Sequence, residues 1–157
     1  MFIDTQIWVF AKKKPTPENF SSQEAFQEAV DCHQTCQQFL LKAIEQEQIG
    51  MTSHQITEIS HAFSFRGLKI PRNQTQAFLQ DLELQENIQI IPLQLKDYHL
   101  ALSASVRSGT HVWDYLWVLP LAPHITRIIS CDRHFQHASL RLKGTELINP
   151  IKKWFHL

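Results

Sequence analysis

Two aspartates follow short predicted strands. Asp4 comes directly after Met1–Ile3, and Asp132 comes two residues after the predicted strand Ile125–Ser130. In open parallel sheets, ligands bind beyond the carboxyl ends of the strands, so we expect both carboxylates at one edge of a sheet. A single Asp at such a position commonly caps the next helix. Two of them at the same edge, joined by two further acids, favour a functional site.

A third carboxylate, Asp114, stands inside the apolar stretch Val112–Leu119. A helix that is apolar all round is buried, and a carboxylate within it loses its hydration unless a partner compensates. That partner is either a cation or a buried hydrogen-bond donor. In the structural alternative, Arg107 or His111 forms a salt bridge with Asp114, or Asp114 caps this short helix.

The fourth acid, Glu58, lies on the edge of a helical face defined by Ile56, Ile59 and Phe63. His61 follows it by three residues, which gives the ExxH pattern of carboxylate-bridged di-iron bundles. That pattern comes in pairs in such bundles, and the chain has no second copy on a matching helix. We therefore interpret His54 and His61 as surface or internally satisfied histidines.

Four carboxylates without an obligatory Cys or His would make an all-oxygen site. Hard oxygen ligands select Mg²⁺ or Mn²⁺ over zinc. Such ions neutralise phosphate charge, lower the pKa of a bound water and stabilise a leaving oxygen. The residues therefore predict metal-assisted phosphoryl chemistry, with Asp4, Glu58, Asp114 and Asp132 as metal ligands.

These acids need a scaffold, and the spacing of apolar residues and chain breakers predicts alternating strands and helices. Strands are predicted at 1–3, 49–51, 88–91, 125–130 and 147–148. A first helical element begins at Asp4 and ends at the loop Lys12–Ser22, and further helices are predicted at about 22–47, 53–63, 71–82, 95–106 and 112–119, the last one stopped by Pro120. The order β, α, α, β, α, α, β, α, α, β, β indicates an α/β fold with a mostly parallel central sheet and helices on both faces.

Composition limits the class of protein. The 157 residues suit a single domain, 1–157, and 43% hydrophobic with 19% charged residues is a globular balance. No apolar run approaches a membrane span, and the first ten residues lack the features of a signal peptide. Three cysteines without framework spacing indicate reduced thiols in a cytoplasmic protein. Zero net charge gives no nucleic-acid footprint by itself.

An ordered set of motifs resembles the PIN-domain ribonucleases, and within them the small single-domain toxins of the VapC kind. The motifs, which span Phe2 to Pro150, are FIDTQIW, TSHQITEIS, HVWDYLWV, IISCDRHF and LINP. The resemblance implies a Rossmann-like three-layer α/β/α fold and a carboxylate cluster that binds Mg²⁺ or Mn²⁺. It also implies hydrolysis of phosphodiester bonds in RNA.

The resemblance also assigns roles to residues of this chain. The four family acids fall on Asp4, Glu58, Asp114 and Asp132. Ser130 takes the place of a small hydroxyl residue that could orient a carboxylate or a water, and Phe135 matches a core aromatic. The chain departs from the family at Gln6, where Asn or Ser is frequent, in the longer segment 12–47, and in the bulky third motif with Trp113 and Trp117.

Other interpretations stay open. A PIN-like fold can bind RNA or a protein without cutting, whereas an acid-aspartate phosphotransferase would want a DxD pair or a lysine partner. Candidates for RNA contact are Lys12–Lys14, Arg66 with Lys69 and Arg72, and Arg133, although solvated charge is an equal explanation. Trp8 could stack on a base, but a core role is favoured. The toxin version adds an antitoxin protein, and by analogy a homodimer.

Overall fold

The computed structural model describes residues 1–66 and 68–156, and its centre is a five-stranded sheet in which every pairing is parallel. The strand order is β3-β2-β1-β4-β5. The strands are β1 Phe2–Ile3, β2 Ile49–Thr52, β3 Ile88–Ile91, β4 Arg127–Ile129 and β5 Glu146–Ile148. The two strands that precede the predicted acids, β1 and β4, are therefore neighbours in the middle of the sheet.

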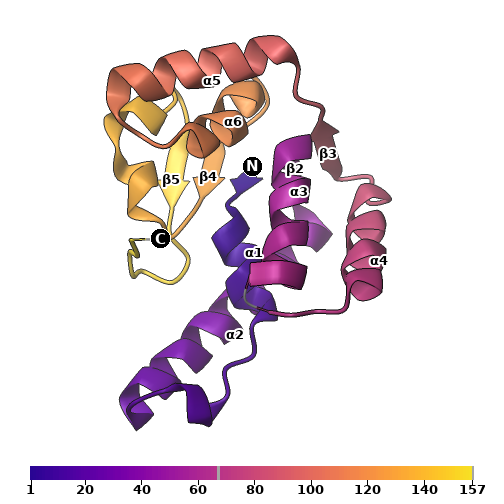
Figure 1. Ribbon diagram of the computed structural model, residues 1–157, viewed down its shortest axis with the longest axis vertical. Coiled ribbons are helices and arrows are strands. Elements are labelled where there is room, and N and C mark those ends of the chain that lie inside the picture. Colours follow the sequence, from indigo (N-terminus) through magenta and orange to yellow (C-terminus); the bar gives the residue numbers. More distant parts are fainter. Residues whose placement is uncertain (67, 157) are drawn as a thin grey trace.

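Within the described residues, six α-helices lie between or beside these strands (Figure 1). They are α1 Thr5–Lys12, α2 Gln23–Gln46, α3 Ser53–His61, α4 Arg72–Glu83, α5 Leu95–Ser108 and α6 Val112–Leu121. A π-helical turn, Ala62–Arg66, extends α3, and short 3₁₀ turns occupy Pro17–Asn19, Arg133–Gln136 and Ala138–Leu140. The element order is the one that the sequence predicts.

The sheet buries a hydrophobic cluster on each face, because successive strand residues point to opposite sides. Phe2 packs with the α5–α6 side, where its ring lies 6.2 Å from Trp117 and 6.0 Å from Phe135. Ile3 packs on the other side with α1, including the buried Trp8. Helices thus cover both faces, which confirms the predicted three-layer α/β/α architecture with a Rossmann-like parallel sheet.

Most element boundaries differ from prediction by one or two residues, and α6 and β4 are two examples. The last predicted helix does not stop at Pro120 but continues to Leu121, with Pro120 in its final turn. Leu121 is fully buried, so packing favours the extra residue over the steric preference against proline near a helix end. β4 covers only Arg127–Ile129, shorter than the predicted 125–130.

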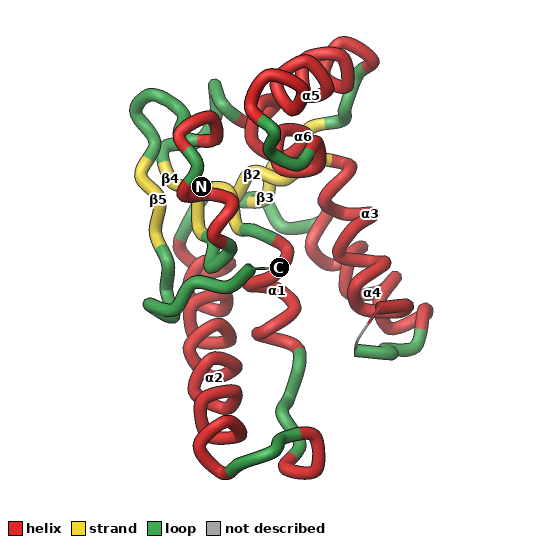
Figure 2. Tube along the Cα trace, turned by 60° about the vertical axis from the view of Figure 1, so that its left-hand side comes forward, coloured by secondary structure: helices red, strands yellow, loops and turns green. Residues whose placement is uncertain are grey.

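The long helix α2 forms an arm. Figures 1 and 2 both show α2 and the segment that leads into it extending away from the strands. All three buried residues of this helix, Cys36, Leu40 and Ala43, lie in its C-terminal half, where it packs against α1. Within residues 1–66 and 68–156, no helix combines the length and the apolar character that crossing a bilayer requires.

Gly50 in β2 allows helix α6 to approach the sheet closely. A Cβ atom built at this position would lie 3.0 Å from Leu121 Cδ2 and 3.4 Å from Ile125 Cγ2. Both side chains are buried, so neither can move away freely. The same contact fixes the height of α6, the helix that carries Asp114, above the strands.

We predict that Gly50→Val lowers the free energy of unfolding by about 1–3 kcal/mol, because the added methyl groups overpack this contact. Urea denaturation followed by circular dichroism measures the change. Gln89→Val is the matched control, since Gln89 pairs with Gly50 in register but is exposed on the edge strand β3. Equal stability of both variants would show that the close approach of α6 does not limit residue size at Gly50.

Candidate active site

Asp4 and Asp132 leave the same edge of the sheet, as predicted. β1 pairs with β4 through Phe2↔Ile128 and Ile3↔Ile129, and the Asp4 amide donates to the Ile129 carbonyl at 2.9 Å. Both side chains are buried, with exposed fractions of 3% for Asp4 and 8% for Asp132. The apolar strands thus deliver two carboxylates side by side at the carboxyl end of the sheet.

Both aspartates also serve as helix caps. Asp4 Oδ1 accepts from the Gln6 amide at 3.4 Å, and Asp132 Oδ1 accepts from the His134 amide at 2.9 Å. Each cap uses one carboxylate oxygen, which leaves the second oxygen of each group available for another interaction. The capping alternative and the functional interpretation are therefore compatible at these positions.

Ser130 links the two aspartates. Its hydroxyl donates to Asp4 Oδ2 at 2.6 Å and accepts from the Asp132 amide at 3.0 Å. Ser130 is completely buried, so these two bonds orient its hydroxyl group, with the O–H pointing toward Asp4 Oδ2. Ser130, the small hydroxyl residue that the family resemblance suggests, thus orients the Asp4 carboxylate and the backbone amide of Asp132.

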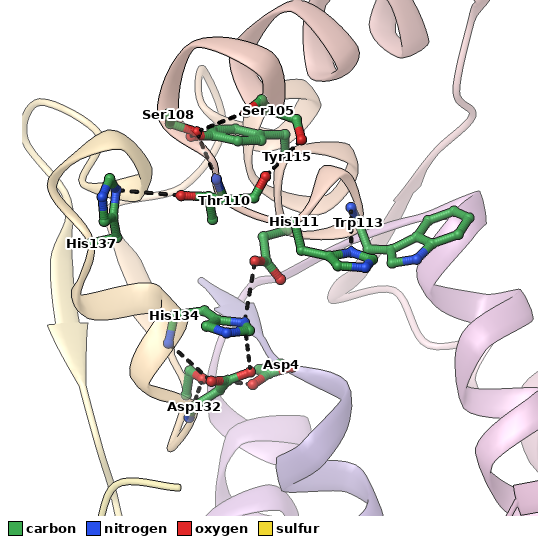
Figure 3. A network of polar contacts seen from close by, with 12 residues as sticks. Asp4, Ser105, Ser108, Thr110, His111, Trp113, Tyr115, Asp132, His134 and His137 are labelled. Carbon is green, nitrogen blue, oxygen red and sulfur yellow. Dashed lines mark hydrogen bonds and ion pairs between the residues drawn. The ribbon is translucent and has the colours of Figure 1, made fainter. Parts of the chain in front are cut away.

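Asp114 projects from α6 toward this edge. It is 3% exposed, and its Oδ2 is buried without a hydrogen-bond partner among the described residues. The nearest cationic candidate is His134, whose Nδ1 lies 3.7 Å from Asp114 Oδ2 and 3.6 Å from Asp132 Oδ2. Figure 3 shows the His134 ring above Asp132, facing the helix that carries His111 and Trp113.

The partners that the sequence suggests for Asp114 are not the ones found. In the part of the chain that the structure describes, neither Arg107 nor His111 forms an ion pair with Asp114. The Nδ1 atom of His111 accepts from the Trp113 amide at 3.5 Å and caps α6 itself. Because His111 Nδ1 is used for this cap, the same nitrogen cannot also face Asp114, which lies one turn further along the helix.

Glu58 joins the cluster from α3. Thr5, the first residue of α1, donates its hydroxyl to Glu58 Oε2 at 2.7 Å. The carboxyl group is only partly buried, and Arg66 at the end of the π-helical turn exerts an attractive charge on it. Four separate elements thus contribute one carboxylate each to this edge of the sheet.

Burial and mutual repulsion disturb the ionisation of these acids. Desolvation raises the pKa of Asp4 to about 6, with a further increase from the Asp132 charge and a decrease from the Ser130 hydrogen bond. Desolvation also raises the pKa of Asp114 to about 7, and the charges of Asp132 and Asp4 add to it. The pKa of Glu58 rises to about 7 for the same first cause, with Asp4 and Asp114 contributing.

These residues fit a hard cation in donor chemistry. Every ligand atom would be an oxygen, and one buried Asp114 oxygen lacks a hydrogen-bond partner among the described residues. The raised pKa values show that burial and mutual repulsion disfavour the ionised carboxylates, and a bound cation would offset both. As they stand, however, no three His, Cys, Asp or Glu side chains within residues 1–66 and 68–156 form a group arranged to hold a metal ion. Metal binding would therefore require the carboxylates to draw closer together.

Sequence reasoning missed two neighbours of the acids. His134 lies in the 3₁₀ turn that Asp132 caps, and Thr5 directly follows Asp4. A polar residue within two positions of a predicted ligand was the available signal in both cases. The exposed Trp113 also lies next to Asp114 in sequence, and its ring stacks on His54 with centroids 4.7 Å apart.

Other residues proposed from the sequence lie elsewhere. Lys12–Lys14 are at the far end of α1 from Asp4, with the Lys12 ammonium 4.4 Å from the centroid of the Phe78 ring. Trp8 is buried and donates to the Ile3 carbonyl, which confirms its core role. His61 stacks on Phe65 and is not part of the cluster.

Comparison of the chain with protein-family models and with curated protein sequences found no match.

The clustered acids predict an unusual dependence of stability on pH. Asp114 ionises near pH 4 in the unfolded chain and near pH 7 in the folded protein, so the folded state holds the extra proton between these values. The contribution of Asp114 to the free energy of unfolding therefore falls as the pH rises from about 4 to about 7. In Asp114→Asn, that slope should be shallower by up to about 1.4 kcal/mol per pH unit.

Urea denaturation between pH 4 and 8, in the presence of EDTA, measures the two slopes. Asp81→Asn is the control, because Asp81 is exposed on α4 and its replacement should leave the slope unchanged. Identical slopes for wild type and Asp114→Asn would mean that Asp114 is solvated or paired in solution.

Proposed function

We propose that this protein is a ribonuclease of the PIN-domain kind, which hydrolyses phosphodiester bonds in RNA with the help of Mg²⁺ or Mn²⁺. The observation that carries the proposal is the convergence of Asp4, Glu58, Asp114 and Asp132 at the carboxyl edge of one parallel sheet. Structural ion pairs do not explain this convergence, because among the described residues only His134 and Arg66 bring a basic group near the four acids. A cation that they share would offset their repulsion.

The carboxylates would hold the metal, and the bound ion would lower the pKa of an attacking water and neutralise charge on the phosphate. The remaining residues position these ligands. Ser130 directs one oxygen of Asp4, and Thr5 directs one oxygen of Glu58. His134 stands beside Asp114 and Asp132, where its ring limits how the two carboxylates can turn.

Two surface features support a nucleic-acid substrate over a small phosphorylated molecule. Trp113 is 46% exposed and adjoins Asp114, and exposed aromatic rings stack on unpaired bases. The positive charge of Arg66 offsets part of the rise in the Glu58 pKa, so a basic group lies near the rim of the acids. A strand of RNA carries both the bases and the phosphates that such groups bind.

The second candidate is a PIN-like module that binds RNA or a protein without cutting it. The finding that favours it is the spacing of the described side chains, which leaves no ready-made group of three metal ligands. The two candidates differ in one measurable property, since only the ribonuclease requires a metal and the carboxylates for turnover.

The proposal extends to a cellular setting. The thiols of Cys32, Cys36 and Cys131 are all free, which suits a reducing compartment such as the cytoplasm. In the toxin version of the function, a protein antitoxin would restrain the ribonuclease, and the active form would be a homodimer. Both partners belong to the proposal and rest on the family resemblance.

We predict that the purified protein cleaves single-stranded RNA only when Mg²⁺ or Mn²⁺ is present. Asp4→Asn or Asp132→Asn should reduce kcat/KM by about 10²-fold or more, because Asn keeps the shape of the side chain and the cap but removes the charge that holds the cation. Gel analysis of a labelled RNA pool, with circular dichroism of the same samples, gives both activity and folding.

Asp81→Asn again provides the control, as an exposed carboxylate away from the sheet edge. A folded Asp4→Asn protein that cleaves as fast as wild type would refute the assigned site. Binding of RNA without cleavage by the wild type, under any metal condition, would favour the non-catalytic module.

We also predict direct metal binding. Mn²⁺ should bind with a dissociation constant in the millimolar range or tighter and raise the melting temperature through linkage. Asp114→Asn should weaken binding by about tenfold, or about 1.4 kcal/mol. Isothermal titration calorimetry at pH 8, where the acids are ionised, measures this, and unchanged affinity in the variant would remove Asp114 from the ligand set.

A further inference from the structure

A hollow of about 810 Å³ lies beside the carboxylates, and His134 is the residue that lines it and also faces Asp114 and Asp132. It lies between the turn that joins α5 to α6, the 3₁₀ turn Arg133–Gln136 and the C-terminal segment at His156. Its lining shares one property: it is rich in nitrogen donors, which are Arg133, His111, His134, His137 and His156. None of its described lining residues is acidic, which contrasts with the cluster next to it.

The hydrogen bonds around two of these histidines fix which ring nitrogen carries the proton. The Ser139 amide donates to His137 Nδ1 at 3.3 Å, so this nitrogen accepts and Nε2 carries the hydrogen. The Trp113 amide donates to His111 Nδ1 in the same way, at 3.5 Å. In both rings, the nitrogen that is not tied to the backbone is the donor.

Arg133 and His156 complete the set. Arg133 NH1 donates to His156 Nε2 at 2.9 Å, so the proton of the His156 ring is on Nδ1. A guanidinium has five N–H donors, and Arg133 forms no ion pair with a carboxylate in the described part of the chain. Among the donors that line the hollow, only His134 faces an acid in the described part of the chain, and Arg133, His111, His137 and His156 do not.

Hydrogen-bond donors that no carboxylate already occupies can bind an anion. His134 forms the boundary between the two sites, since its ring lines the hollow while its Nδ1 faces Asp114 and Asp132 at 3.7 and 3.6 Å. An RNA strand with one phosphate at the carboxylates would carry its neighbouring phosphates along the adjoining surface. Of the two sites, only the hollow offers donors without carboxylates for such a phosphate.

We propose that this hollow, lined by His111, Arg133, His137 and His156, binds a phosphate of the RNA strand next to the one held at the carboxylates. The inference rests on the proposed function for the identity of the strand, whereas the phosphate site itself depends only on the donors. Because the donors are partly exposed, a single phosphate binds weakly, and the site contributes mainly when the rest of the strand is also bound.

The experiment compares two dinucleotides, UpU and its 5′-phosphorylated form pUpU, with the full chain in EDTA at fixed salt. NMR of the histidine rings reports binding and gives the dissociation constants. We expect pUpU to bind about tenfold more tightly than UpU, since a hydrogen bond to a charged group contributes at least that much. The ring signals of His137 and His156 should move, while those of His124, outside the hollow, should not.

Two variants test the assigned donors. His137→Asn retains an acceptor that can cap Ser139 but removes the outer N–H, and His156→Ala removes an exposed ring whose only hydrogen bond in the described structure is to Arg133. Each should reduce the preference for pUpU severalfold while UpU affinity stays the same. His124→Asn, a change at an exposed histidine, should leave the preference intact.

The outcomes separate this inference from the proposed function. Equal affinity for UpU and pUpU, or an unchanged preference in folded His137→Asn and His156→Ala proteins, would overturn the phosphate site. Inorganic phosphate that binds as tightly as pUpU would overturn its assignment to an RNA strand. A tenfold preference for pUpU in a protein that cleaves no RNA would support the phosphate site. The same result would count against the proposed ribonuclease activity but not against the phosphate site.

Discussion

Repulsion between carboxylates at one buried edge is the constraint on which the rest of this structure depends. Asp4, Asp114 and Glu58 are each desolvated and each feels the charge of another acid, so that their pKa values rise. Such an arrangement opposes folding near neutral pH. The fold tolerates it because apolar clusters on both faces of the sheet supply far more favourable burial than the acids remove.

The scaffold limits the movement of these acids by short, specific contacts. β1 is only two residues long, yet its pairing with β4 and the Ser130 hydrogen bond fix Asp4 against Asp132. Gly50 permits the close approach of α6 that brings in Asp114. Glu58 has more freedom, because one hydroxyl from Thr5 is its only hydrogen-bond partner among the described residues. The Asp114 carboxylate forms no side-chain hydrogen bond among the described residues. The site thus combines two aspartates that hydrogen bonds hold firmly with two acids, Asp114 and Glu58, that can adjust.

Much of this arrangement could be predicted from the sequence. The apolar runs before Asp4 and Asp132 identify parallel strands, and the wholly apolar surroundings of Asp114 identify a buried carboxylate. The neighbour of Asp114 could not be predicted, because His134 reaches it through a 3₁₀ turn whose geometry has no periodic pattern. Lys12–Lys14, which are candidates for RNA contact, lie away from the carboxylate edge because two turns of α1 separate them from Asp4.

The arm formed by α2 has a different consequence, which concerns how stability is distributed. Its buried residues begin at Cys36, so the half of the helix before that point adds no fully buried side chain to the core. Amide hydrogens there can exchange through local opening, whereas those after Cys36 depend on opening of the core itself. The outer half of the arm is held by a few partly exposed contacts, such as His33 Nδ1 with the Phe10 carbonyl at 2.9 Å and the Glu28–Lys153 ion pair. It can therefore open locally at a lower free energy than the core that supports the carboxylate edge.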